Sequence, residues 1–353
     1  VIMATSRENA SSCIDISGKT ENNLKIHYQL SKLNSYNKGE IMKQKRIVSL
    51  DIIRGLAIYL IVFMNSLEVF PRVAGENIIK THTDATIYNI EEVFIENKFI
   101  GLFSLLFGIS MGIFMDNARR KSLSPLKLMF RRLLFLLIVG IITSMFLTPF
   151  FAYAIIGLII MFVENLKKPK LTLIFLIVVI LSFIAISIYQ NNFFHLNIAI
   201  TLDMLLGLFL WQSGTISNFK KYKRQYLISL IIGFITIIIV GLNQKYFNID
   251  KNLILYLITP LQTFIYFILL MFITQSQMVR QWLKPAEKVG KTAFTNFILQ
   301  ILLLNLIIRI FFNSSCPTPS QSILISVITI LIMSVLTKVW LKCFKQGPLE
   351  KIW

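Results

Sequence analysis

Apolar and polar residues alternate in long blocks along this 353-residue chain, and the blocks predict its secondary structure. An apolar run of about 18 residues or more is long enough to cross a bilayer as a helix. Every backbone polar group must be satisfied inside lipid, so helices are the expected spanning form. The expected fold is an all-α polytopic transmembrane helical bundle of ten spans. The ten apolar segments are 48–67, 99–115, 133–148, 152–163, 171–189, 197–213, 227–242, 253–275, 293–312 and 321–341.

The third and fourth segments are short and lie close together. Only Thr148, Pro149 and Phe150 stand between the nominal helix cores. Proline lacks a backbone N–H and clashes with the preceding turn, so it ends one helix and starts the next. The pattern therefore predicts a helical hairpin here.

Lysine and arginine are distributed unevenly among the connections between these segments. Taken alternately along the chain, one set of connections holds 24 of them and the other set holds five. Basic residues are retained on the cytoplasmic side of membrane proteins. We therefore expect a multi-pass protein of a bacterial cell membrane, with both termini in the cytoplasm.

The chain divides at about residue 42 into two parts of different composition. Residues 1–41 are polar, rich in Ser, Asn and Lys, and too poor in apolar residues to offset their ordering entropy. They lack the apolar run of a signal peptide. Met42 precedes KQKRIVSLD, so we interpret 1–41 as an upstream extension of a misassigned start rather than a disordered cytoplasmic tail. Residues 42–353 form a single transmembrane domain with a net acidic outer loop at 68–98.

Composition narrows the class of partner. The chain is 55% hydrophobic and only 15% charged, and its formal net charge is +19. The basic residues lie between the apolar blocks, as in membrane proteins, so we expect the lipid bilayer as a partner and no nucleic acid. Three cysteines, none in a C-x-x-C pair, predict neither a metal site nor a disulfide framework. Catalytic motifs such as HExxH, GxSxG, a P-loop or a dinucleotide fingerprint are also missing from the sequence.

Candidate chemistry is concentrated at the start of the first span, in RIVSLDIIRGLAIYLIVFMNS, residues 46–66. Arg46, Asp51 and Arg54 form a charge cluster at its mouth. Asp51 and Arg54 are three residues apart, so on a helix they are neighbours and can pair. Two interpretations stay open: an anion site for a phosphate-bearing donor, in which Asp51 orients Arg54, or a structural clamp at the interface.

Other polar residues interrupt the apolar segments. Charged groups inside a membrane are costly, so they count as functional candidates, and Asp51 and Asp203 are the candidate catalytic carboxylates. Polar amides there more often bond neighbouring helices than a substrate. Gly108 and Gly112 form a GxxxG pattern, which predicts a helix-packing surface. The candidate substrate- or anion-binding residues are Arg46, Asp51, Arg54, Asn65, Asn296 and Gln300.

Six blocks resemble the YeiB-like family of bacterial polytopic membrane proteins, a domain of unknown function. In order they are RIVSLDIIRG, KFIGLFSLLFGISMG, YAIIGLI, DMLLGLFLWQSG, VGKTAFTNFILQ and QGPLEKIW. The opening block is also similar to that of membrane acyltransferases of the heparan-glucosaminide type. That similarity implies transfer of an acyl group, with acyl-CoA as its cofactor, to an envelope or extracytoplasmic substrate. The chain departs from the family where a His and an Asp are usual: Thr143 and the turn 148–150 stand near those places, which removes the obvious general base.

A branch of such proteins resembles hydrophobic accessory proteins of lantibiotic export systems. This resemblance implies a non-enzymatic protein that acts with an ABC transporter in export of, or protection from, a cationic amphipathic peptide. The net acidic outer loop suits such a peptide electrostatically. We favour this function, which needs no cofactor, over acyl transfer.

Overall fold

A computed structural model describes most of the chain beyond its N-terminal part. Contacts group Ile47–Trp353 into one compact unit, and the segment interpreted above as an extension, 1–41, lies outside the described residues. Within the described residues the secondary structure is helical and contains no strand, which confirms the all-α class. The described residues are 47–68, 79–143, 149–188, 192–247, 251–312 and 317–352.

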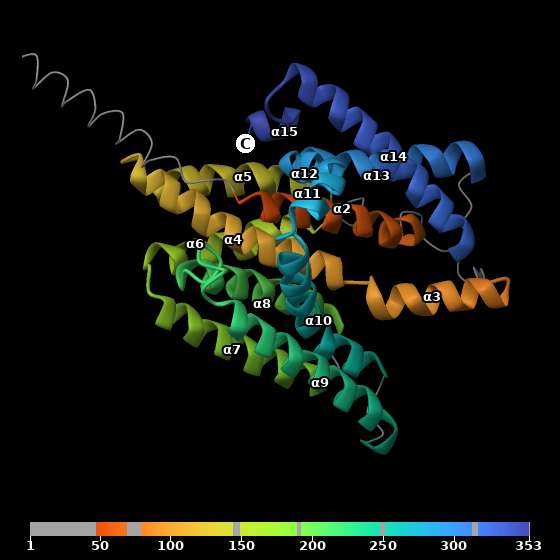
Figure 1. Ribbon diagram of the computed structural model, residues 1–353, viewed down its shortest axis with the longest axis horizontal. Coiled ribbons are helices and arrows are strands. Elements are labelled where there is room, and N and C mark those ends of the chain that lie inside the picture. Colours follow the sequence, from red (N-terminus) through yellow and green to blue (C-terminus); the bar gives the residue numbers. More distant parts are fainter. Residues whose placement is uncertain are drawn as a thin grey trace, which may run out of the picture. The chain divides into compact units, whose positions relative to one another are not determined.

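The helices follow one another with short connections (Figure 1). They are α2 (Val48–Glu68), α3 (His82–Phe94), α4 (Lys98–Arg120), α5 (Pro125–Thr143), α6 (Phe150–Asn165), α7 (Pro169–Ile188), α8 (Asn192–Gln212), α9 (Lys223–Phe247), α10 (Lys251–Ile273), α11 (Gln277–Trp282), α12 (Lys284–Lys291), α13 (Ala293–Phe312), α14 (Pro319–Cys343) and α15 (Pro348–Ile352).

Four helical stretches of the described residues are long and apolar enough to cross a bilayer. They are Val48–Leu67, His82–Arg120, Ala293–Phe311 and Pro319–Cys343. Shorter apolar helices cover four further predicted segments, at Phe150–Asn165, Pro169–Ala185, Asn197–Gln212 and Ile258–Ile273. The long apolar helices indicate a membrane protein, whereas the count of ten spans and the position of the termini stay predictions.

Reporter fusions test that topology directly. Placed after residue 85 and at the C-terminus, they are expected to report the extracytoplasmic side and the cytoplasm, respectively, because of the basic asymmetry of the connections. The same fusion placed after residue 121, in a basic connection, serves as the cytoplasmic control. A cytoplasmic signal after residue 85 would contradict the ten-span arrangement.

Two glycines let α12 pack directly against α2, although the two helices are far apart in sequence. A Cβ added to Gly55 would fall on the carbonyl oxygen of Ala286, and one added to Gly290 would fall on that of Asp51. Only glycine leaves room for backbones this close. The contact places the short helix α12 beside the turn of α2 that carries Asp51 and Arg54.

Glycines also join α4 to α8, which run side by side (Figure 1). A Cβ on Gly108 would fall on the carbonyl oxygen of Met204, and one on Gly207 on that of Leu105. Gly112 lies against the ring of Trp211. The GxxxG pattern of the sequence is thus confirmed as a packing surface.

The predicted hairpin is present as α5 and α6, which pack against each other. A Cβ on Gly140 would lie 2.6 Å from the backbone nitrogen of Phe151, so the two helices are closest near the connecting turn. Helix α6 begins directly after Pro149, as the proline predicts. Residues 144–148 of the hairpin lie outside the described residues.

Two segments read as connections contain helices, which corrects the sequence analysis. In 68–98 the structure has α3, which begins with a capping box between Thr81 and Asp84. The backbone N–H of Ser320, at the start of α14, donates to Asp84 Oδ1 at 3.1 Å and fixes α3 to α14. In 276–292 the structure has α11 and α12. Both segments carry several charges, and their helices are too short or too polar to show in an apolar pattern.

Candidate functional site

A partly open cavity of about 210 Å³ lies among α2, α4, α5, α6, α12, α13 and α15. Most of its wall is apolar and aromatic, and its charged lining residues are three cations and one carboxylate. The lining residues are Arg54, Phe103, Phe107, Ser110, Met111, Met129, Arg132, Leu133, Leu136, Phe150, Tyr153, Gly290, Lys291, Ala293, Phe294 and Glu350.

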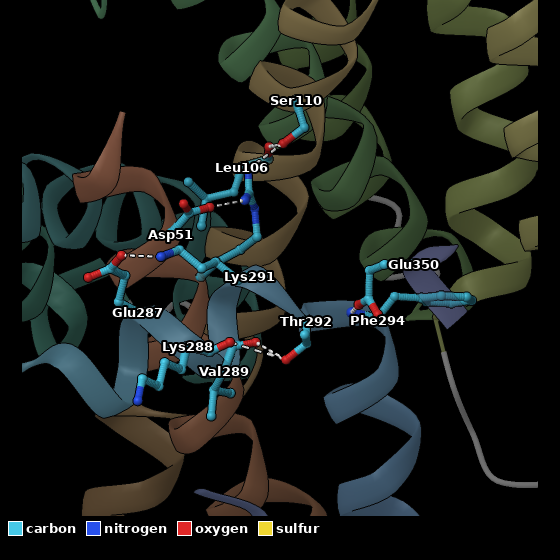
Figure 2. Close-up of polar contacts among 11 residues, drawn as sticks. Asp51, Leu106, Ser110, Glu287, Lys288, Val289, Lys291, Thr292, Phe294 and Glu350 are labelled. Carbon is cyan, nitrogen blue, oxygen red and sulfur yellow. Dashed lines mark hydrogen bonds and ion pairs between the residues drawn. The ribbon is translucent and has the colours of Figure 1, made fainter. Parts of the chain in front are cut away.

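Arg54 is held in a fixed orientation at this cavity by Asp51 and Ser110, which Figure 2 labels. Its Nη1 donates to Asp51 Oδ1 at 3.0 Å, which confirms the pair that the sequence predicts. Its Nη2 donates to the hydroxyl oxygen of Ser110 at 2.6 Å. Ser110 donates in turn to the carbonyl of Leu106 at 2.5 Å, so its lone pairs face the guanidinium. A buried carboxylate and a hydroxyl thus pre-organise the arginine, which reduces the entropy lost when it binds an anion.

Two further cations line the same cavity. The guanidinium of Arg132 lies 3.9 Å from the centre of the Phe114 ring, a cation–π contact. Burial, and then repulsion by Arg131, lower the pKa of Arg132 to about 10, so the group remains charged at neutral pH. Lys291 forms an ion pair with Glu287 at 2.5 Å within α12. The cavity therefore offers positive charge from three different helices.

The carboxylate of Glu350 caps the first turn of α13 at the edge of the cavity. Glu350 Oε1 accepts the backbone N–H groups of Phe294 and Thr295, at 2.7 and 3.0 Å. Its Oε2 accepts the Thr295 hydroxyl at 2.5 Å. A negative charge at a helix N-terminus is stabilised by the free N–H groups and by the helix dipole. This contact ties the GPLE block of the sequence to the cavity wall.

Removal of this cap is expected to destabilise the protein. Glu350→Ala should lower the free energy of unfolding by about 0.5–2 kcal/mol, the usual cost of losing a helix cap. Glu350→Gln should cost less, because its amide oxygen still accepts one N–H. Lys351→Ala, at an exposed neighbouring position, is the matched control and should change nothing. Thermal unfolding of the purified protein measures all three, and equal stability of Glu350→Ala and wild type would contradict the capping role.

Aromatic rings form the apolar part of the wall. Phe150 lies between Phe294 and Phe297, with ring centroids 5.2 and 4.7 Å away, and Phe103 is 5.7 Å from Phe297. The hydroxyl of Tyr153 accepts from Ser104 at 2.9 Å and donates to the carbonyl of Ile100 at 3.1 Å. Such rigid rings give a ligand apolar contact area at low entropic cost.

The other predicted site residues that the structure describes do not line the cavity. Arg46 is outside the described residues, and Asn65 is eleven positions beyond Arg54 on α2, about 16 Å along the helix axis. The buried amide of Asn296 bonds to Thr292 and Thr337. Gln300 is fully buried, as is Asp203, and neither lines the cavity. The structure thus brings together only Asp51 and Arg54 from the predicted set.

Four of the site residues were not among the sequence candidates. Ser110, Arg132, Lys291 and Glu350 come from four different helices, so no short spacing links them to Arg54. Ser110, Lys291 and Glu350 do lie in three of the six blocks that resemble the YeiB-like family, which was a usable signal. Among the described residues there is no group of three or more His, Cys, Asp or Glu placed to hold a metal ion.

Comparison with known proteins finds similarity to one family model and to two relatives, all of them described as of unknown function or uncharacterized. Residues 210–353 match the family model described as "Protein of unknown function (DUF418)". The chain is 24% identical to "Uncharacterized protein YxaH" of Bacillus subtilis (strain 168), over 88% of this chain and 94% of the relative. It is 28% identical to "Uncharacterized 39.9 kDa protein in amylase 3'region" of Bacillus acidopullulyticus, over 89% and 94%. No solved structure matches. These similarities support a DUF418/YeiB-like family and do not extend to acyltransferases or lantibiotic proteins.

Proposed function

We propose that this protein binds a phosphate-bearing amphiphile in the bacterial cell membrane, at the cavity beside Arg54. The observation that carries the proposal is the fixed guanidinium of Arg54, which opens with Arg132 and Lys291 into a cavity walled by aromatic rings. Guanidinium groups recognise phosphate through paired, charge-assisted hydrogen bonds. The rings suit the hydrocarbon of the same ligand, so head and chain are bound by adjoining surfaces.

The size of the cavity defines which part of such a ligand it holds. Drug-sized ligands occupy about 300–1,000 Å³. A cavity of about 210 Å³ is smaller, so it suits a phosphate head and the first methylene groups. The remaining chain would follow the apolar surfaces of the neighbouring helices into lipid.

Acyl transfer, one of the two functions expected from the sequence, would use a ligand of this kind as its donor. Among the described residues, the two carboxylates at or beside the cavity already have other partners, so neither is available as the base for acyl transfer. Asp51 is paired with Arg54, and Glu350 caps α13. A base must come within about 3 Å of the proton it removes, or act through one water. We therefore propose binding as the function of this site, with transfer as a separate step to be tested.

The export-accessory function stays a prediction, and its electrostatic argument becomes weaker. The acidic segment 68–98, which was expected to attract a cationic peptide, includes Glu91, Glu92 and Glu96. Glu91 is buried in α3 instead, and Lys98 lies in the same region with its ammonium donating to the carbonyl of Glu92 at 2.6 Å. An acidic surface that is partly buried attracts a cation less strongly.

Saturable binding of an anionic lipid tests the proposal. The protein is purified in dodecyl maltoside, a detergent without phosphate, and titrated with phosphatidic acid, palmitoyl-CoA or inorganic phosphate, and bound ligand is counted by native mass spectrometry. We expect saturable binding of at least one of the two phosphate amphiphiles, and none of inorganic phosphate alone at the same concentration. Absence of saturable binding by either amphiphile would overturn the proposal. Equal binding of inorganic phosphate would reduce the site to an anion site without an amphiphile.

Two further assays separate the functions that build on this binding. Transfer of a labelled acyl group from acyl-CoA to membrane lipid or glycan acceptors would establish an enzyme. Lower export of a cationic amphipathic peptide on deletion, in a strain with the partner ABC transporter, would establish the accessory. A protein that binds the amphiphile and does neither would be a carrier or sensor of it.

A further inference from the structure

Asp203 is a carboxylate enclosed at the junction of α4, α8 and α10, outside the cavity described above. Its side chain is fully buried. Neither carboxylate oxygen has a hydrogen-bond partner among the residues that the structure describes. An isolated carboxylate in an apolar interior costs many kcal/mol, so in proteins such a group is paired, liganded or neutralised. The question is which of these applies to Asp203.

The immediate surroundings offer Asp203 one acceptor. A Cβ built on Gly101 of α4 would overlap both Asp203 Oδ2 and the hydroxyl oxygen of Thr263, so both oxygens converge on that glycine. The Thr263 hydroxyl donates its proton to the carbonyl of Lys98 at 3.2 Å. Its oxygen lone pairs remain available, and they can accept a hydrogen bond but cannot neutralise a charge.

The ionisable groups on the elements packed against α8 do not compensate Asp203. On α4, the ammonium of Lys98 donates to the carbonyl of Glu92. On α6, the hydroxyl of Tyr153 donates to the carbonyl of Ile100. On α10, the hydroxyl of Tyr266 donates to the carbonyl of Phe94 at 3.2 Å. On α7, Lys170 lies in the first turn, close to the polar end of that helix. The first three groups are bonded elsewhere and Lys170 is exposed, so among the described residues no cation pairs with the carboxylate.

A bound metal ion fits this junction poorly. Hard cations take about six or more oxygen ligands. The junction presents one carboxylate, Asp203, and one hydroxyl, Thr263, and it belongs to no group of three or more His, Cys, Asp or Glu among the described residues. A proton needs only one oxygen and one acceptor, and these are what the junction provides.

We propose that Asp203 is an intramembrane proton-binding site, held as a carboxylic acid whose O–H donates to the hydroxyl oxygen of Thr263. The bond crosses from α8 to α10 over Gly101 and satisfies both the acid and the threonine. Loss of the proton leaves an uncompensated charge between three packed helices and pushes them apart. The proposal is independent of what the cavity binds.

The position of the site gives its proton a structural effect. Gly101, against which Asp203 lies, follows Ile100, whose carbonyl accepts the hydroxyl of the cavity residue Tyr153. The hydroxyl oxygen of Ser104 also lies 2.8 Å from this carbonyl, so its one proton is shared between Ile100 and Tyr153. Movement at Gly101 would therefore act on the turn of α4 that holds one wall of the cavity.

Infrared difference spectroscopy tests the protonation directly. The protein is reconstituted in potassium buffer at neutral pH, and the spectrum of Asp203→Asn is subtracted from that of wild type. We expect a carboxylic-acid C=O stretching band in wild type that Asp203→Asn lacks. Thr263→Val should shift this band, because the acid loses its acceptor. Asp51→Asn, which removes a carboxylate paired with arginine, is the matched control and should leave the acid band unchanged.

A second measurement covers the case in which Asp203→Asn does not fold. Dicyclohexylcarbodiimide reacts with protonated carboxyl groups in apolar surroundings, and we expect mass spectrometry to find it on Asp203 of the wild-type protein. A difference spectrum with only carboxylate bands would overturn the proposal. A second result would also overturn the proposal: sodium, but not potassium, stabilises wild type against thermal unfolding, and Asp203→Asn abolishes this effect. The group bound by Asp203 would then be a metal cation. If the variant is not recovered, failure of the wild-type carboxyl to react would overturn it.

Discussion

Arg54→Gln is expected to weaken binding of the phosphate-bearing amphiphile by about ten- to a hundredfold. Hydrogen bonds to charged groups contribute about 1.5–3 kcal/mol, and each 1.4 kcal/mol is a factor of ten in affinity. Glutamine keeps a polar side chain at the cavity but loses the fixed fork that Asp51 and Ser110 orient. Titration of the variant in dodecyl maltoside, with the amphiphile that wild type binds best, measures the loss.

Variants around Arg54 show whether the pair acts as a unit. Asp51→Asn should also weaken binding, because Arg54 loses its orienting carboxylate, and the double variant should be no worse than Arg54→Gln alone. Lys284→Gln removes a charge from exposed α12 surface outside the cavity and is the control, with unchanged binding. Additive losses from Asp51→Asn and Arg54→Gln would show instead that the two residues act separately.

Gly290→Ala is expected to have the largest effect on stability. Its methyl group would fall on the carbonyl oxygen of Asp51, which is backbone and cannot rotate away. Overpacking usually costs about 1–3 kcal/mol, and this contact should reach or exceed the upper value because helix α12 must move off α2. Yield after purification and the midpoint of thermal unfolding measure the loss, and the variant should also bind the amphiphile poorly because Arg54 is displaced.

Gly233→Ala is the matched control for that substitution. A Cβ on Gly233 would meet the ends of the Ile265 side chain, at 2.9 and 3.0 Å, and these can rotate aside. The control should lose much less stability than Gly290→Ala. Similar midpoints for the two variants would show that the α2–α12 contact is looser than the structure indicates.

What the sequence predicts well is local. The apolar runs place most of the helices, and the spacing of three between Asp51 and Arg54 predicts their ion pair, because both features repeat within a few turns. The hairpin at Pro149 is likewise predicted from residues that are near one another in sequence. The sequence analysis assigned the residues of α3 to a loop, because they are too polar to show an apolar period. The spacing of Thr81 and Asp84 is nevertheless that of a capping box.

What the sequence does not predict is long-range. Ser110 is 56 positions from Arg54, and Lys291 and Glu350 are farther, so their meeting depends on long-range contacts. The glycines bring α12 onto α2, and the Glu350 cap brings α15 onto α13. The burial of Asp203 could be expected from its apolar neighbours in sequence. Its lack of a partner could not, because a threonine on α10 and a glycine on α4 decide it.

The contact between α2 and α12 also has a consequence for biosynthesis, because α12 is translated long after α2. Helix α2 leaves the ribosome among the first of the apolar helices, and the surface that accepts it, at Ala286 and Gly290, follows more than 200 residues later. At about 5–20 residues per second, Asp51 and Arg54 wait roughly 10–50 s in the membrane before their packing partner is translated. During that interval the pair is accessible to insertion factors and to quality-control proteases, and synthesis of the last quarter of the chain ends that exposure.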